Sequence, residues 1–253
     1  NKNLKNPEEG KIPSFPGDYE ILGMWLSSPN KEKGGYIDLQ EPRVWVDLSL
    51  YEDIFSSSLT GKLQIADGVG LAETLPIIGE ETVHINIRTK GIKKERSGDV
   101  EDGPFTGSDS TGVINIKMRV YKLTNYTKVN EGLFHYTLHL VSEEYIMNLK
   151  SKVRKTTLDP TTLEPRRISA TIKQLYKQFF SRGRIAKKIF VEPTRNLTDI
   201  IIPNQSPFQA FNFLASRAVS AGKHAVGSSF VFYETVRGFF FVSLETLMAG
   251  GGT

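Results

Sequence analysis

Histidines and paired carboxylates are the residues of this 253-residue chain that could support catalysis or bind a metal. His135 and His139 stand four residues apart, which on a helix is the spacing of a metal-binding pair. In the surrounding FHYTLHLV, however, apolar and polar residues alternate. That pattern predicts a strand, on which the two rings lie roughly 13 Å apart at ~3.3 Å per residue. We therefore interpret them as two strand histidines and not as a zinc site.

The acidic pairs Glu80-Glu81 and Glu143-Glu144 could act as a general acid and base, but neither has a nucleophile or a Gly-rich phosphate loop nearby. We expect all four to be solvated carboxylates. The acidic stretches GDVEDG and GSDSTG lack the spacing of a calcium loop, and the chain contains no cysteine for a thiolate site or a disulfide. The sequence thus predicts a protein that is not an enzyme and that uses no metal or cofactor. Turnover of peptidoglycan or nucleotide by the pure protein would contradict this.

Alternating apolar residues predict the strands that carry these side chains. The central stretch contains strands at 44–55, 58–67 and 81–90, and in the first of them Val44, Val46, Leu48 and Leu50 share an apolar face. We expect Gly61 to allow a bulge or a close backbone approach. The connector VGLAETLPIIGEE is too apolar for a solvated loop, so we expect it to fold over the mouth of the sheet.

Further strands are predicted at 18–28, 113–123 and 132–142, and the residues before them form a polar, Pro-containing arm. Six or seven strands with polar turns favour an antiparallel barrel or sandwich over residues 14–145. The polar loop at 91–111 is long for a compact domain, so we expect it to be protease-sensitive in the free protein and protected in an assembly. The first domain is thus predicted to span residues 1–148 as an arm and a β-barrel.

The second half of the chain has helical periodicity. ISATIKQLYKQFF predicts an amphipathic helix over 168–180, with Gly183 near its end. A second helix is expected over 206–222, where Ser206, Pro207 and Gln209 form a capping signal. An aromatic hairpin follows, with its turn near Gly238. These elements predict a mixed α+β domain over 149–253.

The charge is divided between the two halves. Residues 1–150 contain 17 basic and 22 acidic residues, whereas residues 151–253 contain 15 and 6, which gives −5 and +9. The basic excess suits a solvated face, an acidic partner protein or nucleic acid. Most of it lies in Lys152, Arg154, Lys155, Arg166, Arg167, Lys173, Lys177, Arg182, Arg184, Lys187 and Lys188. No apolar run approaches the roughly 20 residues that span a bilayer, so we expect no membrane partner.

Two runs of sequence resemble a known family. IFSSSLTGKLQIADGVGLAETLPIIGEETVHINIRT and LTDIIIPNQSPFQAFNFLASRAVSAGKHAVGSSFVFYETVRGFFFVSLETL together cover about a third of the chain. They are similar to conserved blocks of the baseplate or tail hub proteins of T-even-type contractile-tail phages. The most specific parts are S-L-T-G followed by L-P-I-I-G-E-E, and N-Q-S-P-F followed by the aromatic hairpin.

This resemblance implies a non-enzymatic homotrimer in the tail baseplate of the virion. Each family subunit carries two similar β-barrel tube domains, and six barrels form a ring between the tail tube and the central spike. The implied partners are further copies of the chain, tail tube or tube-initiator proteins and the spike protein, and genome DNA only passes through the lumen. We find one barrel, and a second would lie beyond Thr253. The start at Asn and the end in Ala-Gly-Gly-Gly-Thr favour a segment of a longer protein.

A ring subunit must bury apolar connectors and match charges with its neighbours. We expect the acidic barrel of one subunit to meet the basic second half of the next. The interface candidates are Leu75, Pro76, Ile77, Ile78, Lys187 and Lys188.

Two alternatives from other classes stay open. A single-stranded nucleic-acid-binding β-barrel protein would use the basic segment, with Tyr176, Phe179, Phe180 and Phe190 stacking on bases. A tail-associated cell-wall hydrolase would require a carboxylate whose mutation abolishes hydrolysis.

Overall fold

The fold of the chain is taken from a computed structural model. It describes residues 19–29, 35–40, 44–74, 77, 79–89, 113–180, 187–222 and 229–250. The chain divides into two compact units. The first contains Asn1–Leu50 and Thr60–Val141, and the second contains Tyr51–Leu59 and Ser142–Thr253. The short segment 51–59 thus belongs with the second half of the chain, and the division falls before residue 148, at the start of a helix.

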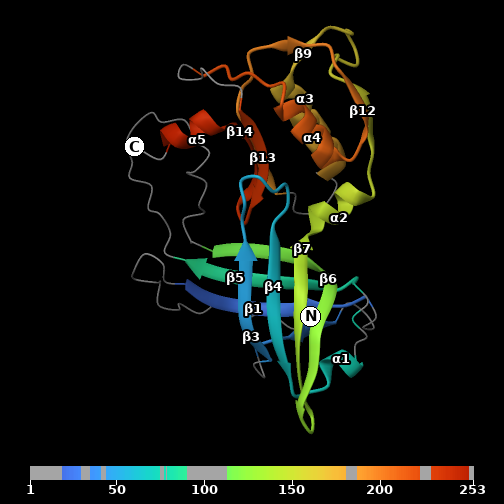
Figure 1. The fold of residues 1–253 in the computed structure, drawn as a ribbon, viewed down its shortest axis with the longest axis vertical. Coiled ribbons are helices and arrows are strands. Elements are labelled where there is room, and N and C mark those ends of the chain that lie inside the picture. The colour runs from blue at the N-terminus through green and yellow to red at the C-terminus, as the bar shows by residue number, and fades with distance from the viewer. Residues whose placement is uncertain are drawn as a thin grey trace. The chain divides into compact units, whose positions relative to one another are not determined.

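A seven-stranded antiparallel sheet forms the first unit and curls into a half-barrel (Figure 1). Its strand order is β2-β1-β5-β6-β7-β4-β3. The strands are β1 (Tyr19–Ser27), β2 (Tyr36–Asp38), β3 (Trp45–Tyr51), β4 (Thr60–Asp67), β5 (Thr82–Thr89), β6 (Val113–Asn130) and β7 (Leu133–Ser142). The mainly β fold class is confirmed. Closure of the sheet into a barrel stays a prediction.

One face of this sheet carries the core, as the alternation in the sequence predicts. Ile116 and Met118 on β6 are buried, and so are Tyr136 and Leu138 on β7, while the residues between them face outward or are half-buried. Gly61 meets the close backbone approach that we expected, since a Cβ there would lie 3.0 Å from the carbonyl oxygen of Ser49.

Strand β3 buries less of its apolar face than the alternation predicts. Val46 is 51% exposed, and Leu48 and Leu50 are only half-buried. The reason is the position of β3 at the end of the described strand order, because an edge strand has a neighbour on one side only.

The apolar connector after β4 begins with a short helix, α1 (Leu71–Thr74). Asp67, at the end of β4, is buried, and its carboxylate accepts hydrogen bonds from the backbone N–H groups of Leu71 and Ala72, each at 2.9 Å. The hydroxyl of Tyr136 also donates to this carboxylate. This anchor fixes the start of the connector. The N-terminal arm, the loop at 91–111 and Gly183 lie outside the described residues.

The second unit is mixed α+β. Its helices are α2 (Glu143–Leu149), α3 (Ile168–Phe180), α4 (Pro207–Ala215) and α5 (Leu244–Gly250). Its strands are β8 (Val153–Thr156), β9 (Arg166–Arg167), β10 (Lys188–Val191), β11 (Leu197–Thr198), β12 (Ile201–Gln205), β13 (Phe230–Thr235) and β14 (Gly238–Ser243). They form a β10-β14-β13 sheet and the pairs β11-β9 and β12-β8. Within the described part of the chain, no helix has the length and apolar character needed to cross a membrane.

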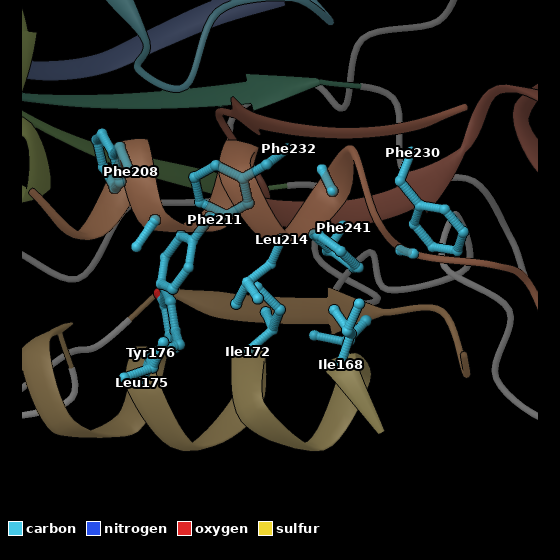
Figure 2. Close-up of a cluster of buried hydrophobic side chains, with 14 of the residues drawn as sticks. Ile168, Ile172, Leu175, Tyr176, Phe208, Phe211, Leu214, Phe230, Phe232 and Phe241 are labelled. Carbon is cyan, nitrogen blue, oxygen red and sulfur yellow. The ribbon is translucent and has the colours of Figure 1, made fainter. Parts of the chain in front are cut away.

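Aromatic side chains dominate the core of the second unit. Figure 2 shows Ile172 and Tyr176 from α3 directed toward Phe211 and Leu214 from α4. Phe232 of β13 packs edge-on against Phe211, with ring centroids 4.7 Å apart. Because each buried aromatic residue removes about 150–250 Å² from water, this cluster is the main source of stability in the unit.

Helix α4 begins where the capping signal places it, with the backbone N–H of Ser206 donating to Gln209 Oε1 at 3.1 Å. It ends at Ala215, seven residues before the predicted end. The cause is an extended pairing of the chain that follows, in which the N–H of Arg195 donates to the carbonyl of Val219 and the N–H of Ala221 to that of Pro193. Extended residues cannot also continue a helix.

Candidate functional site

The predicted apolar interface lies mostly outside the described residues. Leu75, Pro76 and Ile78 have no described position, and Ile77 is half-buried. The role of LPIIG in subunit contacts therefore stays a prediction.

The two predicted interface lysines have different surroundings. Lys188 is exposed at the start of β10. The side chain of Lys187 is only 18% exposed, and its Nζ lies 3.2 Å from Glu144 Oε2 and also pairs with the fully buried carboxylate of Glu234. Lys187 is thus bound inside its own unit, which does not suit the surface role that we expected for it.

This buried ion triad of Glu144, Lys187 and Glu234 joins several parts of the second unit. Glu144 comes from α2, Lys187 precedes β10 and Glu234 lies on β13. The second oxygen of Glu234 accepts the backbone N–H of Leu59 at 2.8 Å, which ties the segment Tyr51–Leu59 to β13. The hydroxyl of Tyr176 donates to the carbonyl of Lys187 at 2.7 Å.

The environment of the triad changes the pKa values of its members. Burial by itself would lower the pKa of Lys187, but Glu234 and Glu144 hold it above its ordinary value. Burial raises the pKa of Glu234, and Lys187 opposes that rise. Lys187 therefore stays charged at neutral pH and compensates the two carboxylates around it.

Two of the four carboxylates that we expected to be solvated are buried. Glu144 belongs to the ion triad, and Glu81 is fully buried, with one carboxylate oxygen accepting the N–H of Gly79 at 2.9 Å. Glu80 is exposed and Glu143 is half-buried. These contacts make the burial of Glu81 and Glu144 possible, because a buried carboxylate without a partner loses its hydration and gains no other interaction in return.

The histidines lie on β7, as the alternation predicts. His135 is exposed, and His139 Nε2 lies 2.8 Å from Thr124 Oγ1 on the neighbouring strand β6. Partial burial, with Lys122 and Lys62 nearby, lowers the pKa of His139. In the described residues, no group of three or more His, Asp or Glu side chains is placed to hold a metal ion.

Two of the four aromatic residues considered for base stacking are not accessible. Tyr176 and Phe180 are buried in the core of the second unit, and Phe179 and Phe190 are half-buried. Base stacking needs an exposed ring face. The nucleic-acid alternative therefore loses two of its four candidate stacking residues.

A pocket of about 570 Å³ lies between β8, β12 and the loop that precedes β9. Its cationic residues are Arg154 and Lys155, and the guanidinium of Arg154 is oriented by donating to Asn204 Oδ1 at 3.1 Å. The apolar lining consists of Leu158, Pro160, Leu163, Ile201 and Ile202. We refer to this site as the basic pocket. It combines positive charge with apolar surface, which suits a partner that carries the opposite charge and an apolar anchor.

Two large apolar side chains at the basic pocket face solvent. Ile201 is 80% exposed and Leu163 is 69% exposed. The sequence patterns that we used do not reveal them, because Leu163 is isolated in a polar loop and Ile201 lies in a run of three isoleucines that shows no alternation. The available signal is the sequence D-P-T-T before Leu163, which is typical of a turn closed by an aspartate side chain.

No protein-family model matches the chain, and no curated protein matches it. Among solved structures, the chain is similar to the tail protein from Neisseria meningitidis MC58, with a TM-score of 0.45 and 10% sequence identity. The similarity covers 88% of this chain and 50% of that protein. The chain thus spans about half the length of that tail protein.

Proposed function

We propose that this chain is a structural component of a phage tail baseplate hub, that it assembles as a trimeric ring and that it has no catalytic activity. The ring would join the tail tube to the central spike. Its partners would be further copies of the chain, the tail tube or tube-initiator proteins and the spike protein, and the genome would pass through the lumen of its tube domains.

The observation that carries this proposal is the location of the two family-like runs. The first run, residues 54–89, includes β4 and β5, which lie within the curled sheet of the first unit. The second run, residues 197–247, includes α4, β13 and β14, which supply most of the aromatic core of the second unit. The resemblance therefore falls on the scaffold of each unit, which is where a structural protein and its relatives are expected to agree.

The polar residues of these elements support the same interpretation. Asp67 anchors the start of α1, Glu81 binds the backbone of Gly79, and Glu234 belongs to the ion triad. Each of these side chains has a structural partner. A hydrolase would instead need a carboxylate that is free to reach a substrate, whereas Asp159, which lines the basic pocket, accepts the N–H groups of Thr161 and Thr162 and pairs with Arg166.

The experiment that tests this proposal measures the molar mass of the purified 253-residue chain in solution, alone and with tail tube and spike proteins. We expect a particle of three chains that binds both partners. A monomer that binds neither partner would overturn the proposal, and so would hydrolysis of peptidoglycan by the pure protein. Salt-dependent binding to single-stranded DNA would instead favour the nucleic-acid alternative.

A further inference from the structure

An acidic turn at residues 52–55 projects a large apolar side chain from the second unit. Phe55 is 72% exposed and Ile54 is 40% exposed. We refer to residues 52–55 as the acidic turn, because Glu52 and Asp53 precede the two apolar residues. Burial of these two adjacent apolar side chains in a complex would remove their surface from water and so favour binding.

Hydrogen bonds hold this acidic turn in one conformation. The carboxylate of Asp53 accepts the N–H of Phe55 at 2.8 Å, and its carbonyl accepts the N–H of Ser56 at 3.0 Å. Glu52 Oε1 accepts the N–H of Val236 at 2.6 Å. A preorganised turn presents its anchor residue with a small entropy loss on binding.

The basic pocket is held in shape in a similar way. The N–H of Leu163 donates to the carbonyl of Asp159 at 2.9 Å, and the carboxylate of Asp159 accepts the N–H groups of Thr161 and Thr162. Asp159 also pairs with Arg166 of β9 at 3.3 Å, so its charge is balanced by a neighbouring cation. The positive charge of Arg154 and Lys155 therefore sets the charge of the pocket.

Leu163 has a strained backbone conformation as well as an exposed side chain. Its φ angle is +59°, in the left-handed region that asparagine and glycine adopt far more readily than leucine. Such a conformation is unfavourable for leucine, and strain of this kind clusters at functional sites. Leu163 thus combines a strained backbone with an exposed side chain at the rim of the pocket, which makes it a candidate contact residue.

We infer that the acidic turn of one copy of the chain inserts into the basic pocket of a second copy. Phe55 would supply the apolar anchor against Leu163 and Ile201, and Asp53 would face Lys155. The pocket volume of about 570 Å³ lies within the ~300–1,000 Å³ range of sites that enclose ligand groups, so an aromatic ring fits. Charge complementarity selects a second copy, because the chain itself carries both the acidic anchor and its basic counterpart.

The inferred contact is heterologous, since the two partners use different surfaces. Repeated around an axis it closes a ring, whereas without closure it would produce a filament. The inference rests on the proposed ring assembly and names the part of each copy that meets the next. A stable interface buries about 800 Å² on each partner, so this contact is an anchor within a larger interface.

Engineered cysteines test the contact directly, because the chain contains no cysteine of its own. One preparation carries Ile54→Cys, which keeps the anchor Phe55, and a second, size-tagged preparation carries Ile201→Cys. After mixing and mild oxidation we expect a disulfide between the two preparations, which requires Cα atoms about 4.4–6.8 Å apart. The control replaces Ile201→Cys by Met248→Cys, which lies on α5 of the same unit and is 78% exposed.

The outcomes separate this inference from the ring proposal. Cross-linking specific to the Ile201→Cys mixture supports the contact. Equal cross-linking with Met248→Cys, or none in a preparation that still forms trimers, overturns the contact and leaves the ring proposal intact. A wild-type chain that never self-associates overturns both.

A second pair of variants guards against effects on folding. Leu163→Asn places a residue that tolerates the left-handed conformation, so we expect unchanged or higher stability together with self-association at least about tenfold weaker. Phe55→Ala should weaken self-association about 30-fold, as loss of a ~2 kcal/mol anchor does. Val69→Ala removes an exposed apolar residue of the first unit and should change neither property. Wild-type association by folded Leu163→Asn and Phe55→Ala proteins would overturn the inference.

Discussion

Lys187 and Lys188 are neighbours in the chain with opposite surroundings. Lys187 compensates two carboxylates in a buried site, whereas Lys188 faces solvent. The contribution of a charged side chain to stability depends on which groups lose a partner when it is removed. A buried carboxylate that loses its cation is strongly unfavourable. Lys187 and Lys188 are therefore a matched pair for mutagenesis: they have the same residue type and adjacent sequence positions, and only their surroundings differ.

Lys187→Met should lower the free energy of unfolding by about 3–5 kcal/mol, because Glu144 and Glu234 lose their shared cation. Lys188→Met should change it by no more than about 0.5 kcal/mol. Urea denaturation followed by circular dichroism and by tyrosine fluorescence measures both values. Equal effects of the two substitutions would show that the ion triad does not form.

Tyr176 makes the stability of the second unit dependent on alkaline pH. Burial, with Glu144 and Glu234 nearby, raises the pKa of its phenol above the ordinary 10.0. The unfolded chain therefore releases this proton at lower pH than the folded chain does. Stability from this group is fully present below pH 10.0 and is lost as the pH rises above it.

Tyr176→Phe should cost about 1 kcal/mol near pH 7, where the hydrogen bond to Lys187 is lost, and should reduce the loss of stability above pH 10.0. Urea titrations across this pH range provide the test. The same substitution at exposed Tyr121 is the control. If Tyr176→Phe loses stability above pH 10.0 as steeply as the wild type, the buried phenol is not a cause of alkaline unfolding.

At the scale of elements, the sequence predicts best where one face of an element is buried. The spacing of Ile168, Ile172 and Leu175 predicts α3 with its observed bounds, because helical periodicity and burial agree there. The alternation along β6 and β7 predicts their core faces for the same reason. Elements whose ends depend on distant pairing are predicted less well. Helix α4 ends early because residues 219–221 pair with 193–195. The local sequence of the helix does not reveal this partner segment, so it could not predict where the helix ends.

The candidate sites are predicted less well than the elements. Lys187 and Glu234 are 47 residues apart, and their local sequences resemble those of surface residues, so only the fold brings them together. The acidic turn and the basic pocket are recognised by their exposed apolar side chains. Hydrophobic periodicity does not predict which side chains of a loop are exposed. The charge division points to the basic half but not to the acidic turn, because residues 51–59 belong to the second unit.

Gly238 is required where β10 and β14 run parallel. Its φ angle is +148°, and a Cβ at this position would lie 2.4 Å from the carbonyl oxygen of Lys188. Gly238→Ala should therefore lower the free energy of unfolding by about 2–3 kcal/mol. Gly132→Ala is the matched control, because φ is +83° there and no atom lies within 4 Å of the added Cβ. Urea denaturation should show a loss of only about 1 kcal/mol for the control, and an equal loss at both positions would mean that the close approach is absent.

For the whole molecule, charge should affect the rate of assembly more than its final extent. Reversal of both Lys187 and Lys188 would not test this, because a glutamate at position 187 would break the ion triad. Lys155→Glu with Lys188→Glu reverses two exposed charges instead. We expect slower assembly in light scattering, most clearly below about 0.1 M salt, where the Debye length exceeds ~10 Å. Assembly at the wild-type rate in low salt would place these charges outside the interface.

The measurement that tests the central claim most directly is the molar mass of the wild-type chain by sedimentation equilibrium over a range of concentrations. A structural ring subunit should reach three times the 28.3 kDa mass of one chain. Phe55→Ala should shift the same transition to higher concentration. A wild-type chain that stays at 28.3 kDa, or that stops at a dimer, would contradict the proposed trimeric hub.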